Sequence, residues 1–407
     1  MNDGLELFDD LSEDDHRESR RGARRGRPPR RRTKRTGLKW SIVAALVLVI
    51  AVGAYLGVKQ FTGIGVYPDY VGSGTRDVVF QVNPGDTTSD IGDDMKQAGI
   101  VASTGAFIKA GADNSAVAGV QPGFYVLKEH MSGAAAVRLI TTASSRVGLL
   151  EIKSGQQLDD TTSTAGKVTS GILTHIADAT CATLNGKKTC VSVAQLRGAI
   201  QSTDPAALGV PDWAIPSVTT AAPAHRLEGL IMPGVYNLKP GETAAQTLKR
   251  IMDQSSAQLQ AAGLPSASQQ NSGFSPYQVL TLASIVEREA GTTADMPKIA
   301  RVFYNRLQQG MELQSDATVD YGLDRPMVAT SPKDRPKAGA YNTYANAGLP
   351  PTPVSSPSAD AIQAASQPAA GPWLYFVVCQ KDRSSCFATN LTQHNKNVQL
   401  AIHNGVF

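Results

Sequence analysis

Glu287 and Glu289 are the residues of this 407-residue sequence best placed for acid–base chemistry. Both fall in the last turn of a predicted helix, where the helix dipole is negative and disfavours a further negative charge. Burial and an unfavourable dipole each raise the pKa of a carboxyl group, and a general acid near neutral pH requires a raised pKa. In the alternative interpretation both glutamates are solvated and Arg288 is their local counter-charge. The segment alone does not decide between the two.

The helix that must position these glutamates has clear limits in the sequence. Ser275 suits the N-cap, Pro276 suits the first helical position, and Gln278 completes a capping box. The run ends at Gly291, after apolar residues that recur at helical spacing: Val279, Leu282, Ala283 and Val286. A second helix is predicted from about Ala294 to Gln309.

Three motifs in and after the first helix carry a resemblance to a known family. They are LASIVEREA at 282–290, RVFYNRLQQGMELQSDATVDYG at 301–322, and YNTY at 341–344 followed by GLPPTP. In this order they closely resemble the MltG/YceG-like family of endolytic murein transglycosylases, and the resemblance covers most of the chain beyond about Val78. In that family the first glutamate of the SIVE motif is the catalytic acid, so the resemblance assigns this role to Glu287. Helical geometry does not choose between Glu287 and Glu289, because both border the apolar face.

The resemblance implies a lytic transglycosylase that cuts the MurNAc–GlcNAc bond inside nascent peptidoglycan strands. Such a lyase needs one carboxyl group, which protonates the glycosidic oxygen and then takes the proton of the C6 hydroxyl as a 1,6-anhydro ring closes. No metal and no cofactor are expected. Hydrolases usually use two carboxylates, and a muramidase with Glu289 or Asp316 as the second carboxylate is a remote alternative. The main alternative is a non-catalytic, membrane-anchored scaffold that binds peptidoglycan.

The same resemblance implies substrate-binding residues near the acid. Residues 314–316 match the family's LQSDPTV, in which Ala317 replaces the proline, and residues 227–236, LEGLIMPGVY, stand where the family has LEGYLFPDTY. Amides, hydroxyls and tyrosine rings in such motifs suit the many polar groups and the ring faces of a glycan. The candidate binding residues are Glu228, Gln314, Ser315, Asp316, Tyr341, Asn342, Thr343 and Tyr344.

Structural roles are the alternative for several of these residues. Asp316 and Asn342 could stabilise turns in loops, and Glu228 could cap a neighbouring stretch of backbone. His394 and Asn395 keep an HN pair of the family, for which a capping or packing role is equally open.

The N-terminal region predicts a single-pass membrane anchor. Residues 1–39 carry 12 Lys or Arg and 8 Asp or Glu, whereas the rest of the chain has equal numbers of basic and acidic residues. Residues 40–58 hold no charge, and their length of roughly 28 Å matches the hydrocarbon core of a bilayer. The positive-inside rule places the tail in the cytoplasm and everything after Lys59 outside. A cleaved signal peptide is the rival interpretation, which the long leader disfavours.

Four cysteines fit an oxidising compartment outside the membrane. A central Asn-Gly turn brings Cys181 directly opposite Cys190 in a hairpin, at a non-hydrogen-bonded pair where the strands approach closely enough for a disulfide. Cys379 and Cys386 flank a short polar loop after a predicted strand, and we expect a second disulfide there. Free thiols are the alternative. Neither pair has the ligand set of a zinc site.

The predicted fold class is α+β. The parts are a cytoplasmic tail at 1–39, a transmembrane helix at 40–58, a linker at 59–76, a small module at 77–148 and a catalytic domain at 149–407. Within the module we expect strands at 78–82 and 123–127 and helices at 88–97 and 134–141. Its VNPGDT turn followed by a helix resembles a LysM module, a fold that binds N-acetylglucosamine-containing glycans. A spacer domain of similar outline is the alternative.

The stretch from Leu313 to Pro357 is rich in proline from Pro326 on and has little periodicity. Irregular runs of this length inside a domain are usually functional, so we expect it to line a glycan-binding groove. Further elements are predicted as a strand at 149–152, two helices between 159 and 200, a helix at 358–367, a strand at 373–378 and a final helix from Asn390. The expected partners are peptidoglycan strands, the cell membrane and peptidoglycan synthases. A nucleic acid is excluded, because the region beyond the membrane has no net charge.

Overall fold

The computed structural model describes residues 44–55, 66–163, 165–266, 273–323 and 335–406. The chain divides into two compact units, Met1–Val66 and Tyr67–Phe407. In the first unit, residues 44–55 are helical. No helix within the described ranges is both long and apolar enough to cross a membrane. The two ends of the predicted span, 40–43 and 56–58, lie outside the described residues, as does the tail at 1–39.

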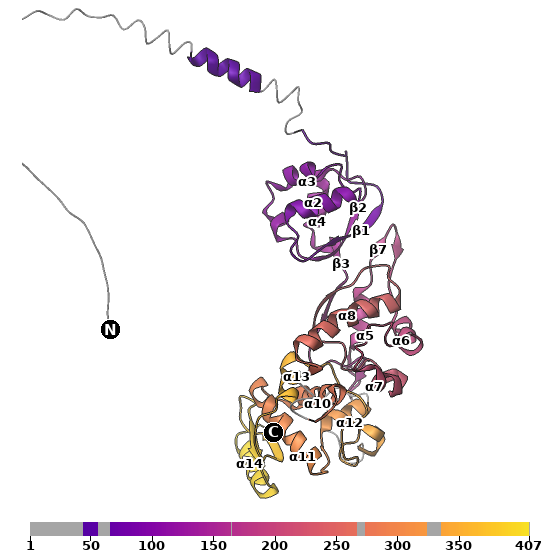
Figure 1. Cartoon of the computed structure of the whole chain (residues 1–407), viewed down its shortest axis with the longest axis vertical. Helices are drawn as coiled ribbons and strands as arrows, with labels where there is room; N and C mark the ends of the chain where they lie inside the picture. The colour runs from indigo at the N-terminus through magenta and orange to yellow at the C-terminus, as the bar shows by residue number, and fades with distance from the viewer. Residues whose placement is uncertain (1–43, 56–65, 164, 267–272, 324–334, 407) are drawn as a thin grey trace, which may run out of the picture. The chain divides into compact units, whose positions relative to one another are not determined.

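The second unit begins with a small module built on an antiparallel sheet in the order β1-β2-β3 (Figure 1). Its elements are β1 (Asp77–Val82), α2 (Thr88–Gln97), α3 (Thr104–Gly111), η1 (Ser115–Gly119), β2 (Gly123–Lys128), α4 (Gly133–Ile140), η2 (Ala143–Ser145) and β3 (Arg146–Val147). The β1–β2 register pairs Phe80 with Tyr125. Both side chains join Met95, Phe107 and Leu127 in a buried core that belongs to the module alone.

Four elements of the module lie within one residue of their predicted bounds, and α3 is missed. Part of the predicted linker also belongs to the module, because the Thr75 amide donates to the Glu129 carbonyl at 2.9 Å and Ser73 pairs with Met131. Residues 59–65 of that linker lie outside the described ranges. The LysM identity of the module stays a prediction.

A mainly helical region follows, with a two-stranded β4–β9 pair at its start. Its elements are β4 (Leu149–Ile152), β5 (Thr161–Thr162), β6 (Val168–Thr169), α5 (Ile172–Ala179), β7 (Thr183–Leu184), β8 (Lys187–Lys188), α6 (Val193–Ser202), α7 (Ile215–Thr220), η3 (Pro223–His225), β9 (Gly234–Asn237) and α8 (Ala244–Ala261). α8 was not predicted, although Thr243 and Gln246 form a capping box at its start. Few large apolar residues, such as Leu248 and Leu259, line its buried face, and small or polar residues make up the rest of the helix. The apolar pattern of α8 is therefore weak.

The C-terminal region is organised around α10 (Pro276–Glu289), which packs against α11, α12 and α13 (Figure 1). The other elements there are η4 (Thr293–Asp295), α11 (Met296–Gln308), α12 (Asp316–Gly322), η5 (Arg335–Tyr341), α13 (Ala359–Ser366), β10 (Tyr375–Val378), β11 (Ser385–Ala388) and α14 (Leu391–His403). Apart from Gln278, every residue of α10 from Pro276 to Val286 is buried. The helix is therefore fixed from several sides at once.

The stretch from Leu313 to Pro357 is less irregular than predicted. α12 and η5 occupy part of it, and the Thr318 hydroxyl donates to the Ser315 carbonyl at 2.8 Å in the first turn of α12. The pattern of apolar residues was too short to indicate these elements, since α12 has only seven residues. Residues 324–334 lie outside the described ranges, and the groove expected along this stretch stays a prediction.

Two disulfide bonds join the cysteine pairs, with Cα separations of 4.1 Å for Cys181–Cys190 and 5.7 Å for Cys379–Cys386. The first bond closes the β7–β8 hairpin, whose tip contacts the first strand of the module. The Asn185 amide donates to Asp77 Oδ2 at 2.7 Å, and the Asp77 amide donates to Asn185 Oδ1 at 2.8 Å. The hairpin thus ties the module to the helical region.

The chain itself forms a second tie at Gly148. β3 pairs with β2 inside the module and β4 pairs with β9 in the helical region, so that Gly148 stands between two different sheets. Its φ of +73° is a left-handed conformation that favours glycine. A Cβ atom at this position would lie 1.8 Å from the Leu238 carbonyl oxygen, so only glycine fits there without a backbone shift.

We expect Gly148→Ala to lower the free energy of unfolding by at least about 2 kcal/mol, because alanine must adopt a left-handed backbone and clash with a carbonyl group. Gly198→Ala is the matched control. Gly198 lies inside α6 with open space around it, so alanine should stabilise that helix by about 0.5–1 kcal/mol. Urea unfolding followed by circular dichroism measures both changes. Effects of the same sign would contradict the prediction.

Candidate active site

The last turn of α10 brings Glu287 and Glu289 to a crowded polar region. The helix starts as predicted, with Ser275 as N-cap and a complete capping box to Gln278. It ends at Ala290, whose amide donates to the Val286 carbonyl at 3.0 Å. The next residue, Gly291, lies so close to the Arg383 carbonyl that a Cβ atom would be 2.2 Å from its oxygen. The loop closed by the Cys379–Cys386 bond therefore packs against the end of α10.

Glu287 is half-buried and binds the start of α13. Its Oε2 atom accepts hydrogen bonds from the Ser358 amide at 3.0 Å and from the Ser358 hydroxyl at 2.5 Å. Ser358 is in turn the N-cap of α13, because its Oγ accepts from the Ala361 amide at 3.2 Å. The carboxylate thus ties the end of α10 to the beginning of α13.

Glu289 faces the second motif instead. Its Oε1 atom accepts a hydrogen bond of 2.5 Å from the Ser315 hydroxyl. Burial raises the pKa of the Glu289 carboxyl above its ordinary value, and the neighbouring Asp316 carboxylate adds to this rise. The hydrogen bonds from Ser315 and from the Ala317 backbone, together with the charge of Arg288, lower the same pKa but do not cancel the rise.

Ser315 and Thr343 join the second motif to the YNTY motif. The Ser315 amide donates to Thr343 Oγ1 at 3.0 Å, and the Gln314 amide donates to the Thr343 carbonyl at 2.9 Å. The Thr318 and Thr343 hydroxyls share a hydrogen bond of 2.8 Å. Ser315 and Thr343 are both buried. These two candidate binding residues therefore support the position of Glu289 from below the surface.

Asp316 and Tyr344 form the more accessible part of this cluster. The Tyr344 hydroxyl donates to Asp316 Oδ1 at 3.0 Å, and the Arg335 guanidinium lies 3.5 Å from the centre of the Tyr344 ring. Arg335 also approaches Asp316 at 3.8 Å. Sequence reasoning missed Arg335, since it stands in a stretch without periodicity and outside the quoted motifs.

The remaining residues of these motifs have different surroundings. Gln314 is exposed and has a left-handed backbone with φ of +52°. Asn342 is buried, and its Oδ1 accepts from the Tyr344 amide at 3.1 Å, which is a turn-stabilising bond. The Tyr341 hydroxyl shares a hydrogen bond of 2.8 Å with Thr352. Within the described ranges, no three acidic, histidine or cysteine side chains gather closely enough to hold a metal ion.

Comparison with known proteins identifies the family of this chain. The sequence profile of the YceG-like family matches residues 80–400. The chain belongs to the YceG-like family. It is similar to proteins named endolytic murein transglycosylase from Bacillus subtilis, with 33% identity over 173 residues, and from Streptococcus pneumoniae serotype 2, with 33% identity over 180 residues. These matches cover 42% and 43% of this chain, but only 47% and 32% of the two relatives.

A solved structure supports the same fold. The crystal structure of a YceG-like protein from Listeria monocytogenes superposes with a TM-score of 0.51 at 24% sequence identity. The match covers 79% of this chain and 99% of that chain. At this identity the likeness shows a shared fold alone, and it includes the mixed arrangement of helices and short sheets described above.

Glu228 of this YceG-like chain lies in the interior, where its side chain is only 1% exposed. Its Oε2 accepts from the Leu158 amide at 3.1 Å, and its carboxyl lies beside the Tyr321 hydroxyl. Burial raises its pKa to about 7, although the Leu158 amide, Tyr321 and Arg197 all act to lower it. Glu228 therefore binds a backbone amide in the interior, which is the structural role given above as the alternative. It does not reach the surface.

An aromatic cluster surrounds this buried carboxyl. The centres of the Tyr321 and Tyr341 rings are 4.9 Å apart. The centre of the His225 ring is 5.2 Å from that of Tyr321 and 5.5 Å from that of Tyr341. His225 Nδ1 and the Tyr321 hydroxyl share a hydrogen bond of 2.6 Å. His225 was not among the predicted site residues, because an isolated histidine gives no signal in one sequence. The predicted HN pair lies elsewhere. His394 has a packing role, because its ring stacks on the Tyr375 ring with their centres 5.3 Å apart, and Asn395 is exposed.

We expect Glu228→Gln to remove a pH dependence of stability. The folded-state pKa of about 7 exceeds the ordinary value of 4.5, so the stability contributed by the protonated form is complete below pH 4.5 and is lost as the pH rises through 7. The wild type should lose up to about 3 kcal/mol between pH 4.5 and 8 from this group. The glutamine variant should lose correspondingly less.

Urea unfolding at pH 5 and at pH 8 measures this difference. Glu151→Gln is the matched control, because Glu151 is an exposed glutamate on β4. An equal pH dependence in the wild type and in Glu228→Gln would contradict the prediction.

Proposed function

We propose that this protein is a membrane-anchored endolytic lytic transglycosylase. It would cut the MurNAc–GlcNAc bond inside nascent peptidoglycan strands and leave 1,6-anhydro-MurNAc ends. The names of the relatives support this activity, but the chain matches less than half the length of each. The activity, the substrate and the partners therefore come to this chain as a proposal, which its own residues must support.

One observation carries the proposal. The Glu289 carboxyl has a pKa raised by burial and is held by Ser315, a residue of the motif that the family resemblance links to substrate. A raised pKa keeps the carboxyl protonated closer to neutral pH, where it can protonate the glycosidic oxygen. The resulting carboxylate can then take the proton from the C6 hydroxyl, and that oxygen closes the anhydro ring. The carboxyl recovers its proton, and no water enters the reaction.

The two glutamates of the motif compete for this role. The family resemblance assigns the acid to Glu287, whereas the contacts favour Glu289. Both carboxyl groups accept hydrogen bonds, Glu287 from the amide and hydroxyl of Ser358 and Glu289 from the Ser315 hydroxyl and the Ala317 backbone. What distinguishes them is that Glu287 binds the start of α13, whereas Glu289 lies against the candidate substrate-binding residues. We therefore propose Glu289 as the acid and base, with Glu287 as the rival to be tested beside it.

The substrate-binding candidates divide by exposure. Gln314, Asp316 and Tyr344 are accessible enough to meet a glycan directly, and Arg335 on the Tyr344 ring joins them. The buried candidates support these groups from behind: Glu228, Ser315, Asn342 and Thr343. Tyr341 is half-buried and packs with the aromatic cluster around Glu228.

The proposed location follows from the N-terminal sequence. An uncharged segment at 40–58 comes after an arginine-rich tail, and residues 44–55 of it are helical. We propose a single crossing of the cell membrane, with the tail inside and residues 60–407 outside. This location would place the enzyme beside the synthases that make new strands, which are its proposed partners.

Glu289→Gln should abolish most cleavage of purified peptidoglycan, by about 10²–10⁴-fold, because glutamine keeps the shape but carries no transferable proton. Its unfolding midpoint in urea should change little. Glu287→Gln should keep activity within about tenfold and lose about 1 kcal/mol of stability, because its bonds to Ser358 lose their charge. An inactive Glu287→Gln beside an active Glu289→Gln would overturn the assignment and favour Glu287.

The product distinguishes the reaction class. We expect each cut to leave an anhydro end that is one water lighter than a hydrolytic end and that borohydride does not reduce. Long anhydro-terminated oligomers should precede disaccharides in the digest, and mass spectrometry of timed samples measures both properties. Reducible ends would indicate a muramidase, and an intact polymer would favour the binding scaffold.

A further inference from the structure

The chain enters the small module through a short segment, residues 67–72, which we call the entry segment. Two hydrogen bonds fasten this segment to the starts of two helices. The Ser103 hydroxyl, at the N-cap of α3, donates to the Pro68 carbonyl at 2.7 Å. The Gly133 amide, at the first position of α4, donates to Asp69 Oδ1 at 2.8 Å. The entry segment is therefore a fixed part of the module and lies across the N-terminal ends of α3 and α4.

Two apolar side chains project from this fixed segment into solvent. Val71 is 98% exposed, although the backbone beside it is held, since the Ser132 amide donates to the Gly72 carbonyl at 3.0 Å. Tyr67 is 49% exposed, and one side of its ring covers Gly105 of α3. A Cβ atom on Gly105 would lie 2.1 Å from that ring, so glycine leaves room for the tyrosine.

α3 adds a third exposed apolar side chain, Ile108, which is 41% exposed. Ile108 comes three residues after Gly105, so the two residues share the side of the helix that the Tyr67 ring covers. Ala112, the C-cap residue of α3, continues this side by one turn and is also exposed. We call the exposed surface of Tyr67, Val71 and Ile108 the entry face.

Charged groups near the entry face are few. Lys109 is the only charged residue of α3. The Asp69 carboxylate binds the start of α4 as described, and the Asp93 carboxylate accepts a hydrogen bond of 2.5 Å from the Thr104 hydroxyl. Asp113, just after α3, is exposed and offsets Lys109. The entry face therefore suits an amphipathic surface better than a strongly charged partner.

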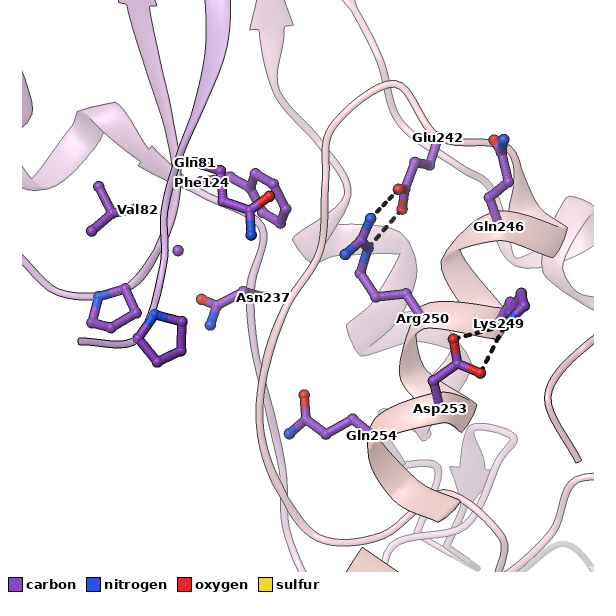
Figure 2. A pocket seen from close by; sticks show the side chains of 13 residues that line it. Gln81, Val82, Phe124, Asn237, Glu242, Gln246, Lys249, Arg250, Asp253 and Gln254 are labelled. Carbon is purple, nitrogen blue, oxygen red and sulfur yellow. Dashed lines mark hydrogen bonds and ion pairs between the residues drawn. The ribbon is translucent and has the colours of Figure 1, made fainter. Parts of the chain in front are cut away.

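The module meets the helical region at other places. Asp77 binds Asn185 of the β7–β8 hairpin, and the Phe124 ring centre lies 5.3 Å from the Arg250 guanidinium on α8 (Figure 2). Neither contact involves the entry face, which stays exposed when the module is joined to the helical region. Apolar side chains that gather on an exposed surface mark a site of interaction.

The length of the chain limits what can cover the entry face. The uncharged segment that we propose as the membrane anchor ends at Val58, and Tyr67 follows nine positions later. Nine residues span at most about 32 Å even when they are fully extended. A bilayer that holds the anchor is therefore always within reach of the entry face, whereas a protein partner must first be recruited. Tyr67 also suits the membrane surface, where tyrosine rings gather.

We propose that the entry face docks on the extracytoplasmic surface of the membrane, with the Tyr67, Val71 and Ile108 side chains at the boundary between headgroups and acyl chains. This inference rests on the proposed anchor at 40–58 and is independent of which glutamate is the acid. Transfer of the three side chains from water to the bilayer supplies the attraction. The module would then rest on the membrane instead of being joined to it by the chain alone.

Fluorescence quenching in lipid nanodiscs tests the contact. The full-length chain is purified in detergent with one engineered cysteine at a time, which is labelled with bimane, because the native cysteines are held in disulfides. The discs hold phosphatidylcholine, with or without a fraction that carries a nitroxide near the headgroup. We expect the nitroxide lipid to lower the fluorescence of Val71→Cys and of Ile108→Cys at least about twofold. Val235→Cys is the control and should change little, since Val235 is a 54% exposed apolar residue on β9.

A reporter at Leu48→Cys, inside the uncharged segment, monitors the anchor separately. Quenching at Leu48→Cys without quenching at Val71→Cys and Ile108→Cys would overturn the docking. The discs hold no other protein, so a face that binds a protein partner would give this result. Equal quenching at Val235→Cys would also overturn the docking, because the contact would not be specific to the entry face. An unquenched Leu48→Cys would overturn the proposed anchor and this inference with it, while cleavage of peptidoglycan by the same chains tests the proposed enzyme independently.

A reporter at Ala112→Cys tests the apolar side chains themselves. Val71→Asp together with Ile108→Asp places charges where the bilayer boundary is apolar, so quenching at Ala112→Cys should fall at least about twofold. Val235→Asp is the matched control and should leave this quenching unchanged. The three substituted positions are exposed, so circular dichroism should show the same fold in all variants. Unchanged quenching in the double aspartate variant would contradict the proposal.

Discussion

The enclosure of α10 is the constraint on which the rest of the C-terminal region depends. A helix with nearly all of its first eleven residues buried can be covered only by packing on several sides, and α11, α12 and α13 supply that cover. Its buried length leaves one place for polar chemistry, which is the last turn. Gly291 then allows the Arg383 backbone to close over the end of the helix. The position of both glutamates therefore follows from hydrophobic packing.

Hydrogen bonds among motifs far apart in sequence complete what the packing begins. Thr343 binds Ser315, and Ser315 binds Glu289, so that three motifs meet at one carboxyl group. Buried polar groups are costly unless they are paired. Substitution of Ser315 or Thr343 would therefore disturb the carboxyl without any contact to a substrate. One short motif can thus contain both buried residues that hold a carboxyl group in place and residues that are exposed at the surface.

Local signals explain which elements could be predicted. The capping box at Ser275, the strand at 149–152 and the Cys181–Cys190 register each depend on neighbours in the sequence, and the structure has all three. α12 could not be found in this way, because it has only seven residues and tertiary packing selects it. α8 does carry a local signal, the capping box of Thr243 and Gln246, but its weak apolar stripe concealed the helix. The burial of Glu228 and the bond from Ser358 to Glu287 are also long-range facts. Whether a motif carboxyl is a support or a proton donor therefore needs the fold.

The charges around Arg288 bear on the proposed role of Glu289 as acid and base. Its guanidinium is held in a largely buried place, where burial lowers its pKa while Asp320 and Glu289 raise it. In the proposed mechanism Glu289 gives up its proton and then takes one back. The Arg288 guanidinium would stabilise the carboxylate between these two steps, which would limit the cost of a buried charge. Under this proposal a single glutamate acts as acid and base in turn.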